Sequence, residues 1–188
     1  MQKILVTGAY VFKAPVIKGD LVIPAVTGNA QKKLLFRVSV HDPPSFPKKG
    51  DYINIFGKIK KISLENNSVV IDVVGDFEPG LKTSLPQVVV GITCVRLTAP
   101  PKKEGNKYIA RINSKLSLLF SESQIETLGI TSERLLSVHG AFWVNEYDGS
   151  YTATMSVKSA VLLQQTPPTL QEITDDGKEA DPCKTPLF

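Results

Sequence analysis

Residues 51–60 read DYINIFGKIK, and this stretch decides the fold class because apolar and polar side chains alternate along it. Successive side chains of a β-strand point to opposite faces. One face of the predicted strand therefore carries Ile53, Ile55, Gly57 and Ile59, and the other carries Tyr52, Asn54, Phe56, Lys58 and Lys60. The first set is typical of a core. The second set is aromatic and basic, where a face turned only to solvent would be merely polar.

The same two-residue period recurs along most of the chain, in runs rich in Val and Ile that are separated by Gly, Pro and Asn. This pattern predicts a mainly β protein. Strands are predicted near residues 3–13, 20–26, 33–41, 51–64 and 69–77, then near 87–98, 107–115, 135–147 and 150–163, with residues 116–120 as the candidate for a fifth strand of the second group. Hairpin turns are predicted at residues 65–68 and at Asp148-Gly149. One short helix is predicted at residues 121–129, with Ser121 as its cap and Gly129 as its stop.

The strands fall into two sets that resemble each other. This predicts two β domains, at residues 1–80 and 87–163, joined by a Pro- and Gly-rich linker at residues 81–86. In each set a glycine, Gly57 or Gly140, precedes a hairpin turn by nine or ten residues. Residues 164–188 bury too little apolar surface to offset chain entropy, so they are predicted to form a disordered acidic C-terminal tail.

The net charge of +4 is divided unevenly along the chain. Residues 164–188 contain five acidic residues and two lysines, a net charge of −3, which leaves +7 on residues 1–163. A basic body beside an acidic tail indicates that the body meets a polyanion, while the tail competes for that surface or recruits a partner. The alternative, that the positive charge only keeps the protein soluble, stays open.

The composition argues against several classes of protein. Hydrophobic residues make up 42% of the chain and charged residues 21%, which is typical of a folded, soluble protein. No apolar run approaches the roughly 18 residues of a spanning helix, and the first residues lack a signal-peptide pattern, so neither secretion nor membrane contact is expected. Cys94 and Cys183 are too far apart for a disulfide framework, so an intracellular, reducing compartment is expected.

Recognisable catalytic and metal-binding motifs are absent from the sequence. His41 and His139 lie in unrelated segments, and neither has a Cys, His or carboxylate at metal-ligand spacing. No nucleophile elbow is present either. We therefore expect a protein that is not an enzyme and that uses no cofactor or metal.

The strand count and spacing of each set resemble the OB-fold, a five-stranded Greek-key barrel. The resemblance implies two tandem five-stranded barrels, with the short helix in the second. Within OB-folds, the chain looks like single-stranded-DNA-binding proteins of the replication protein A and bacterial SSB kind. In that family an acidic tail docks on replication and repair proteins, and the residues here that resemble it are Asp175, Asp176, Asp181, Leu187 and Phe188.

A single-strand binder needs aromatic faces for base stacking and cations along the phosphates. The side chains that fit these roles are Arg37, His41, Lys48, Lys49, Tyr52, Asn54, Phe56, Lys58, Lys60, Arg111, Lys115, Trp143 and Tyr147. We therefore expect a non-enzymatic protein that binds single-stranded nucleic acid, with DNA preferred over RNA only through the resemblance. Because the first set carries more positive charge than the second, it is expected to bind more strongly.

Two other interpretations of the same residues stay open. Tyr52, Phe56 and Trp143 also suit a protein interface, because aromatic residues are enriched there. The chain would then be a structural or adaptor β-sandwich protein, or an accessory subunit that binds only a partner protein. The lysines also suit a solvated edge strand, where they discourage aggregation. The sequence does not decide the oligomeric state, and a dimer stays open.

Overall fold

The computed structural model describes residues 2–28, 33–66, 68–83, 86–147 and 149–163 of the chain. Most of these residues lie in β-strands, and one short helix accompanies them, which confirms the predicted mainly β fold. The first set of strands consists of β1 (Gln2–Val11), β2 (Val16–Lys18), β3 (Asp20–Gly28), β4 (Lys33–Val40), β5 (Tyr52–Glu65) and β6 (Ser68–Pro79). The second set consists of β7 (Val88–Val95), β8 (Lys102–Glu104), β9 (Lys107–Arg111), β10 (Leu116–Ser121), α1 (Glu122–Leu128), β11 (Leu135–Tyr147) and β12 (Ser150–Leu163).

Five strands of the first set close into a ring. β1 pairs with β5, β5 with β6, β6 with β4, β4 with β3, and β3 pairs again with β1. Only the β4–β6 pair is parallel. A five-stranded ring in this Greek-key order is the arrangement that the OB-fold resemblance predicts.

The second set repeats this strand order without the same closure. β7 pairs with β11, β11 with β12, β12 with β10 in parallel, and β10 with β9. No ladder joins β7 to β9 among the described residues, but Thr98, just beyond β7, donates its amide and its hydroxyl to the carbonyl of Arg111 at 2.8 and 3.0 Å. Among the described residues, strand pairing therefore closes the ring in the first set and not in the second.

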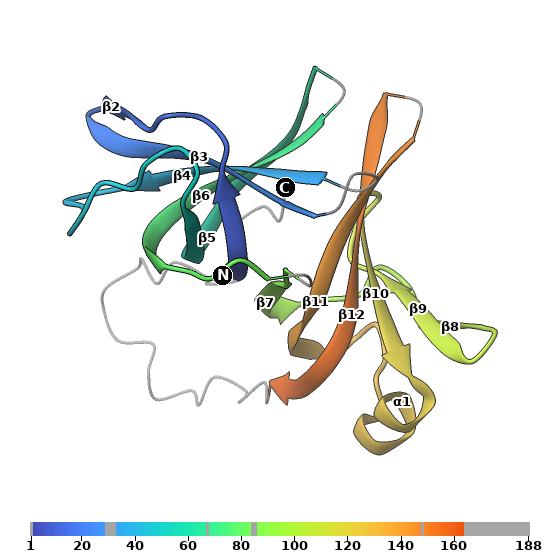
Figure 1. The fold of residues 1–188 in the computed structure, drawn as a ribbon. Coiled ribbons are helices and arrows are strands. Elements are labelled where there is room, and N and C mark those ends of the chain that lie inside the picture. Colours follow the sequence, from blue (N-terminus) through green and yellow to red (C-terminus); the bar gives the residue numbers. More distant parts are fainter. Residues whose placement is uncertain (1, 29–32, 67, 84–85, 148, 164–188) are drawn as a thin grey trace, which may run out of the picture.

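The two sets join into one continuous 12-stranded sheet (Figure 1). The joint is the antiparallel pairing of β1 with β7, from Gln2↔Ile92 to Val6↔Val88. A second contact supports it, because the buried Tyr151 hydroxyl of β12 donates to the carbonyl of Ile62 on β5 at 3.0 Å. The division into two domains with a linker at residues 81–86 stays a prediction, and residues 84–85 of that linker lie outside the described residues.

Local sequence explains the helix and the turns. The Ser121 hydroxyl accepts the amide of Gln124 at 3.2 Å while the Gln124 side chain accepts the amide of Ser121 at 2.9 Å, which is a capping box. Gly129 ends α1 in the left-handed conformation, with φ +54°. The hairpin at residues 65–68 is also confirmed, since Glu65 pairs with Ser68.

The structure differs from the predicted strands in three places. The strand predicted to run to Lys115 ends at Arg111, because the Asn113 side chain accepts the amides of Lys115 and Leu116 and so closes a turn. The short strands β2 and β8 were not predicted, since three residues are too few to show a period.

Among the described residues no helix is long and apolar enough to cross a membrane.

Glycine permits close approach of the strands at matching places in the two sets. A Cβ on Gly57 would lie 2.4 Å from the carbonyl oxygen of Val74, and a Cβ on Gly140 would lie 2.0 Å from that of Ser156. Both glycines belong to the strand that pairs with the last strand of its set, β5 or β11. Glycine inside a strand commonly marks such a bend of a barrel.

Replacing Gly140 is therefore expected to destabilise the protein. Gly140→Ala should lower the free energy of unfolding by about 1–3 kcal/mol, because backbone must move to admit the methyl group. Gly91→Ala is the matched control, since Gly91 lies on the neighbouring strand and a Cβ there would have its nearest neighbour at 3.9 Å. Urea unfolding of both variants tests this. Equal stability of the two would contradict the expectation.

Candidate nucleic-acid interface

The outer face of β5 has the composition that the alternation predicts. Ile53 and Ile55 are buried, whereas Phe56, Lys58 and Lys60 are exposed. The alternation shifts at a β-bulge between Ile59 and Lys61, so the face predicted from residues 51–60 ends there.

Strand β1 adds two side chains to this face. Leu5 is paired with Phe56, and Lys3 is paired with Lys58. These four residues, Lys3, Leu5, Phe56 and Lys58, are called the Phe56 patch below. Leu5 is 43% exposed and Phe56 37%. An accessible ring between cations is the combination that stacks a base and follows the phosphates.

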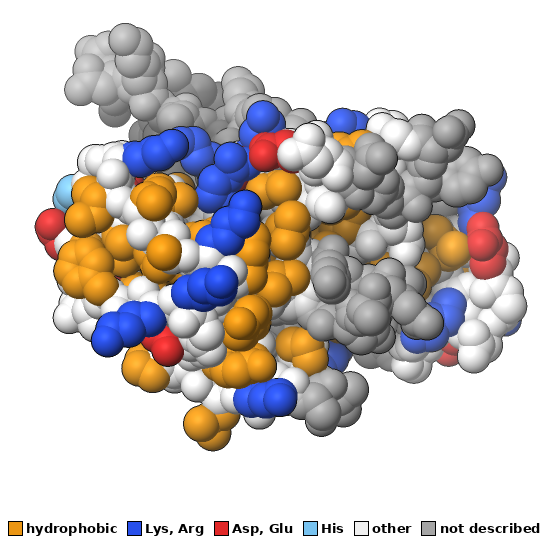
Figure 2. Space-filling model, turned by 45° about the horizontal axis from the view of Figure 1, so that its top comes forward, with side chains coloured by type: hydrophobic (Ala, Val, Ile, Leu, Met, Phe, Trp, Pro, Cys, Tyr) orange, Lys and Arg blue, Asp and Glu red, His pale blue; other side chains and the backbone are white. Residues whose placement is uncertain are grey.

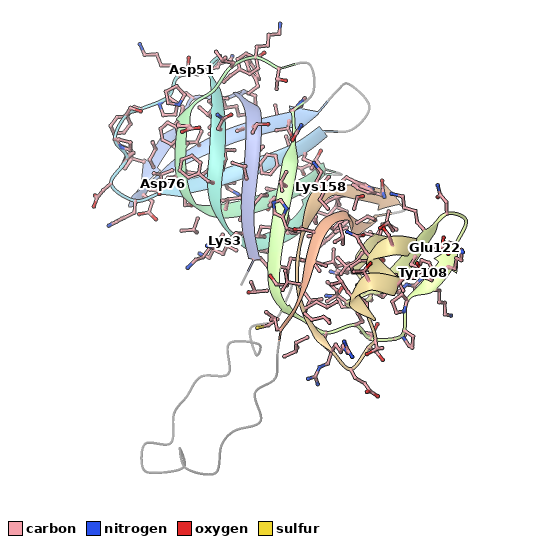
Figure 3. All side chains as sticks on the ribbon, turned by 90° about the horizontal axis from the view of Figure 1, so that it is seen from below. Lys3, Asp51, Asp76, Tyr108, Glu122 and Lys158 are labelled. Atoms are coloured by element: carbon pink, nitrogen blue, oxygen red, sulfur yellow. The ribbon has the colours of Figure 1, made fainter. Side chains whose placement is uncertain are left out.

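The Phe56 patch is flanked by β6 on one side and by β7 on the other, where Val89 and Gly91 are paired with Leu5 and Lys3, and its lysines stay available. Val74, paired with Lys58, is 45% exposed, and Asp76 is paired with Phe56. Among the described residues neither Lys3 nor Lys58 has an ion-pair partner. Figure 3 places Lys3 and Asp76 well away from Asp51, which lies at the opposite end of the first set.

Asn54 and Tyr52 are held by protein contacts. The Asn54 side-chain oxygen accepts the amide of Gly8 at 3.0 Å, and its nitrogen donates to Glu78 at 3.1 Å. The Tyr52 ring packs against the Tyr10 ring, with centroids 5.4 Å apart and planes tilted by 51°. Asn54 therefore has a structural task, while the half-buried Tyr52 has a ring fixed in place.

Lys48 and Lys49 lie on the exposed loop before β5. The amide of Lys48 donates to the Asp51 carboxylate at 2.7 Å, and the amide of Asp51 donates to the carbonyl of Lys48 at 3.1 Å. This loop and the ends of β5 and β6 enclose an open pocket of about 340 Å³. Aromatic rings from Phe46, Tyr52 and Phe77 contribute to its lining, and we call it the Phe46 pocket.

Arg37 lies outward on β4 and is separated from β5 by β6. Its guanidinium donates to Glu65 at 2.6 Å and to Asp72 at 2.7 Å. The hydrogen bond with Glu65 is the main cause that raises the pKa of Arg37, and it lowers the pKa of Glu65. A phosphate at Arg37 would have to compete with two carboxylates.

In the second set Arg111 and Trp143 lie in one cross-strand row. Arg111 is paired with Ser117, Ser117 with Thr154, and Thr154 with Trp143. Three strand spacings separate the two residues at the row's ends, about 14 Å. Trp143 is half-buried and Arg111 is exposed, so this row joins an indole ring and a cation on one outer face.

The other predicted site residues lie apart from this row or outside the described part. The Lys115 ammonium lies over the Tyr151 ring, 4.9 Å from its centroid. The side chain of Tyr147 and the predicted tail residues Asp175, Asp176, Asp181, Leu187 and Phe188 lie outside the described residues. No group of three or more His, Cys, Asp or Glu side chains in the described ranges is placed to hold a metal ion.

Hydrophobic and basic side chains share one face of the first set. Figure 2 shows them interspersed there, with few acidic side chains between them. Lys3 and Leu5 were not predicted as site residues. The sequence shows that they alternate with apolar residues, but it does not show that they pair with β5. Phe46 was not predicted either, because a residue in an irregular loop carries no periodic signal.

His41, just after β4, is exposed and lies near two aspartates. Its Nδ1 lies 3.1 Å from Asp20 Oδ1, and its Nε2 lies 3.5 Å from Asp42 Oδ2. The hydrogen bond to Asp20 is the main cause that raises the pKa of His41 above its ordinary value of 6.5. The imidazolium is therefore favoured in the folded state.

An NMR titration of His41 is expected to show a midpoint above 6.5. Because the folded-state pKa is raised, the stabilisation is complete below the unfolded pKa and is lost as the pH rises through the folded one. The effect on stability should be small and salt-dependent, since the side chain is exposed. Asp20→Asn should lower the midpoint more than Asp42→Asn. A midpoint unchanged by Asp20→Asn would contradict this account.

Comparison with known proteins bears on the fold. No family model and no curated protein matches the chain. The structure is similar to the crystal structure of the wild-type single-stranded DNA binding protein from Thermus aquaticus, with a TM-score of 0.50 and 11% sequence identity, over 89% of this chain and 95% of that chain. A deletion mutant of the same protein gives a TM-score of 0.49 at 11% identity, over 89% and 96% of the two chains. The predicted resemblance is thus confirmed for the fold.

Proposed function

We propose that this protein binds single-stranded DNA and is not an enzyme. The observation that carries the proposal is the Phe56 patch, where an exposed ring and an exposed Leu lie beside two lysines on paired strands of a closed ring. The affinity would come from base stacking and from counterion release at the phosphates, so it would be salt-sensitive and only weakly selective for sequence.

Two further observations support the proposal. The similar structure is, by its description, a single-stranded DNA binding protein, and the likeness extends over both strand sets. The charge of +7 on residues 1–163 favours a polyanionic ligand. The cross-strand row from Arg111 to Trp143 offers a second contact surface for the same molecule of single-stranded DNA. The acidic residues 164–188 would recruit replication or repair proteins or shield the basic surface.

A protein interface on the same patch is the second candidate function. Leu5, Phe56 and Val74 are exposed together, at 43%, 37% and 45%, and such apolar groups also mark sites of protein association. Light scattering at increasing protein concentration separates the two. Self-association that Phe56→Ala abolishes, without binding to any oligonucleotide, would favour the interface.

Fluorescence anisotropy with a labelled 30-nucleotide oligo-dT tests the proposed function directly. The wild-type protein should bind it more tightly than duplex DNA of equal length. Phe56→Ala should weaken binding by about five- to 150-fold, because a stacked base contributes about 1–3 kcal/mol. Lys58→Ala should also reduce the slope of log affinity against log salt by about 0.7, the value for one lost phosphate contact.

Lys102→Ala is the matched control for Lys58→Ala. Lys102 is exposed on β8, at the far edge of the sheet, and its loss removes the same charge. It should leave the affinity and the salt slope nearly unchanged. If Lys58→Ala and Lys102→Ala change the affinity and the salt slope equally, the phosphate contact does not lie at Lys58. If oligo-dT does not bind at low salt, the proposed function is refuted.

A further inference from the structure

The Phe46 pocket lies at one end of the first ring, beyond the Phe56 patch. It is open to solvent, has a volume of about 340 Å³ and is lined by both aromatic and polar residues. Pockets that bind small ligands span roughly 300–1,000 Å³. The space therefore suits one planar group such as a nucleobase.

Two of the three aromatic residues that line the pocket are packed against the protein. Tyr52 is held by its contact with Tyr10, and Phe77 is 6% exposed. Phe46 is the exception, because its ring is 61% exposed on the loop. A solvent-exposed aromatic ring is available to stack on a base. A base inserted here would cover that ring.

Asp51 supplies a hydrogen-bond acceptor at the rim. Its backbone is held by two hydrogen bonds. Its amide donates to the carbonyl of Lys48, and its carbonyl accepts the amide of Val11 at 2.9 Å. One carboxylate oxygen, Oδ2, accepts the amide of Lys48. The other, Oδ1, has no partner among the described residues. A carboxylate accepts hydrogen bonds and repels other acceptors, so it discriminates between base edges.

We infer that the Phe46 pocket takes one unstacked base of the bound strand and prefers a base with an exocyclic amino group. The amino group of cytosine donates to a carboxylate, whereas thymine presents the O4 acceptor at the same position. Lys48 and Lys49, next to the pocket on the same loop, are placed to contact the flanking phosphates. This inference rests on the proposed function and adds a base preference to it.

The test compares oligo-dC and oligo-dT of 20 nucleotides by anisotropy on the full chain. The wild-type protein should bind oligo-dC about fivefold more tightly or better. Asp51→Asn keeps an acceptor for the Lys48 amide but adds a donor, so the preference should vanish or reverse. Phe46→Ala should weaken binding of both oligonucleotides without lowering the melting temperature, because the ring is exposed.

Asp76→Asn is the matched control for Asp51→Asn. It removes the same charge from an exposed aspartate beside Phe56, outside the pocket. It should raise the affinity for both oligonucleotides alike and leave their ratio unchanged. A ratio that Asp51→Asn and Asp76→Asn change equally would overturn the inference.

NMR titration with the two mononucleotides, dCMP and TMP, locates the base. The amides of Gly50, Asp51 and Gly80 around the pocket should shift more with dCMP. Equal binding of both oligonucleotides, with no response to Asp51→Asn, would refute the base preference and leave the proposed function intact. Binding of neither would refute the function itself. Pocket shifts with a proline-rich peptide alone would assign the pocket to a protein partner and overturn the inference.

Discussion

The amide of Gly8 donates a hydrogen bond to the Asn54 side chain at the position where β1 stops pairing with β7 and begins to pair with β3. Before this point β1 lies between β5 and β7, and its last pair with β7 is Val6↔Val88. After it β1 lies between β5 and β3, beginning at Tyr10↔Val26. The register with β5 shifts between Val6 and Ala9, and Gly8 has φ +67°, which glycine adopts without strain. Ring closure and the joint between the two sets both depend on this bulge.

The bulge also divides the candidate interface. On one side Leu5 and Phe56 form the exposed patch, and on the other Tyr10 and Tyr52 pack ring against ring. Residues just after β6 pass close by, since a Cβ on Gly8 would meet the Thr83 side chain at 2.3 Å. The outer face of β5 thus contributes Phe56 to the patch and Tyr52 to the pocket, whose lining also includes the buried Ile53 and Phe77.

Features that depend on neighbours in sequence were predictable from the sequence. The two faces of residues 51–60, the hairpin at residues 65–68 and the capped helix follow from alternation, turn residues and caps. Features that depend on distant pairing were not. Nothing in the sequence pairs Leu5 with Phe56, 51 residues away, or brings Glu65 and Asp72 to the guanidinium of Arg37. Asn54 was assigned to the outer face, yet its amide group is used within the fold.

The pairing of β1 with β7 also determines how a long ligand would be accommodated. Two domains on a flexible linker adjust their separation to the ligand. Here a ladder of five residue pairs joins the two sets directly, and the buried Tyr151 hydroxyl adds a hydrogen bond between them. A single DNA strand that contacts both the Phe56 patch and the row from Arg111 to Trp143 would therefore have to follow the surface of this continuous sheet. If the proposed function holds, the length of DNA covered by one protein molecule would be determined by the dimensions of the sheet.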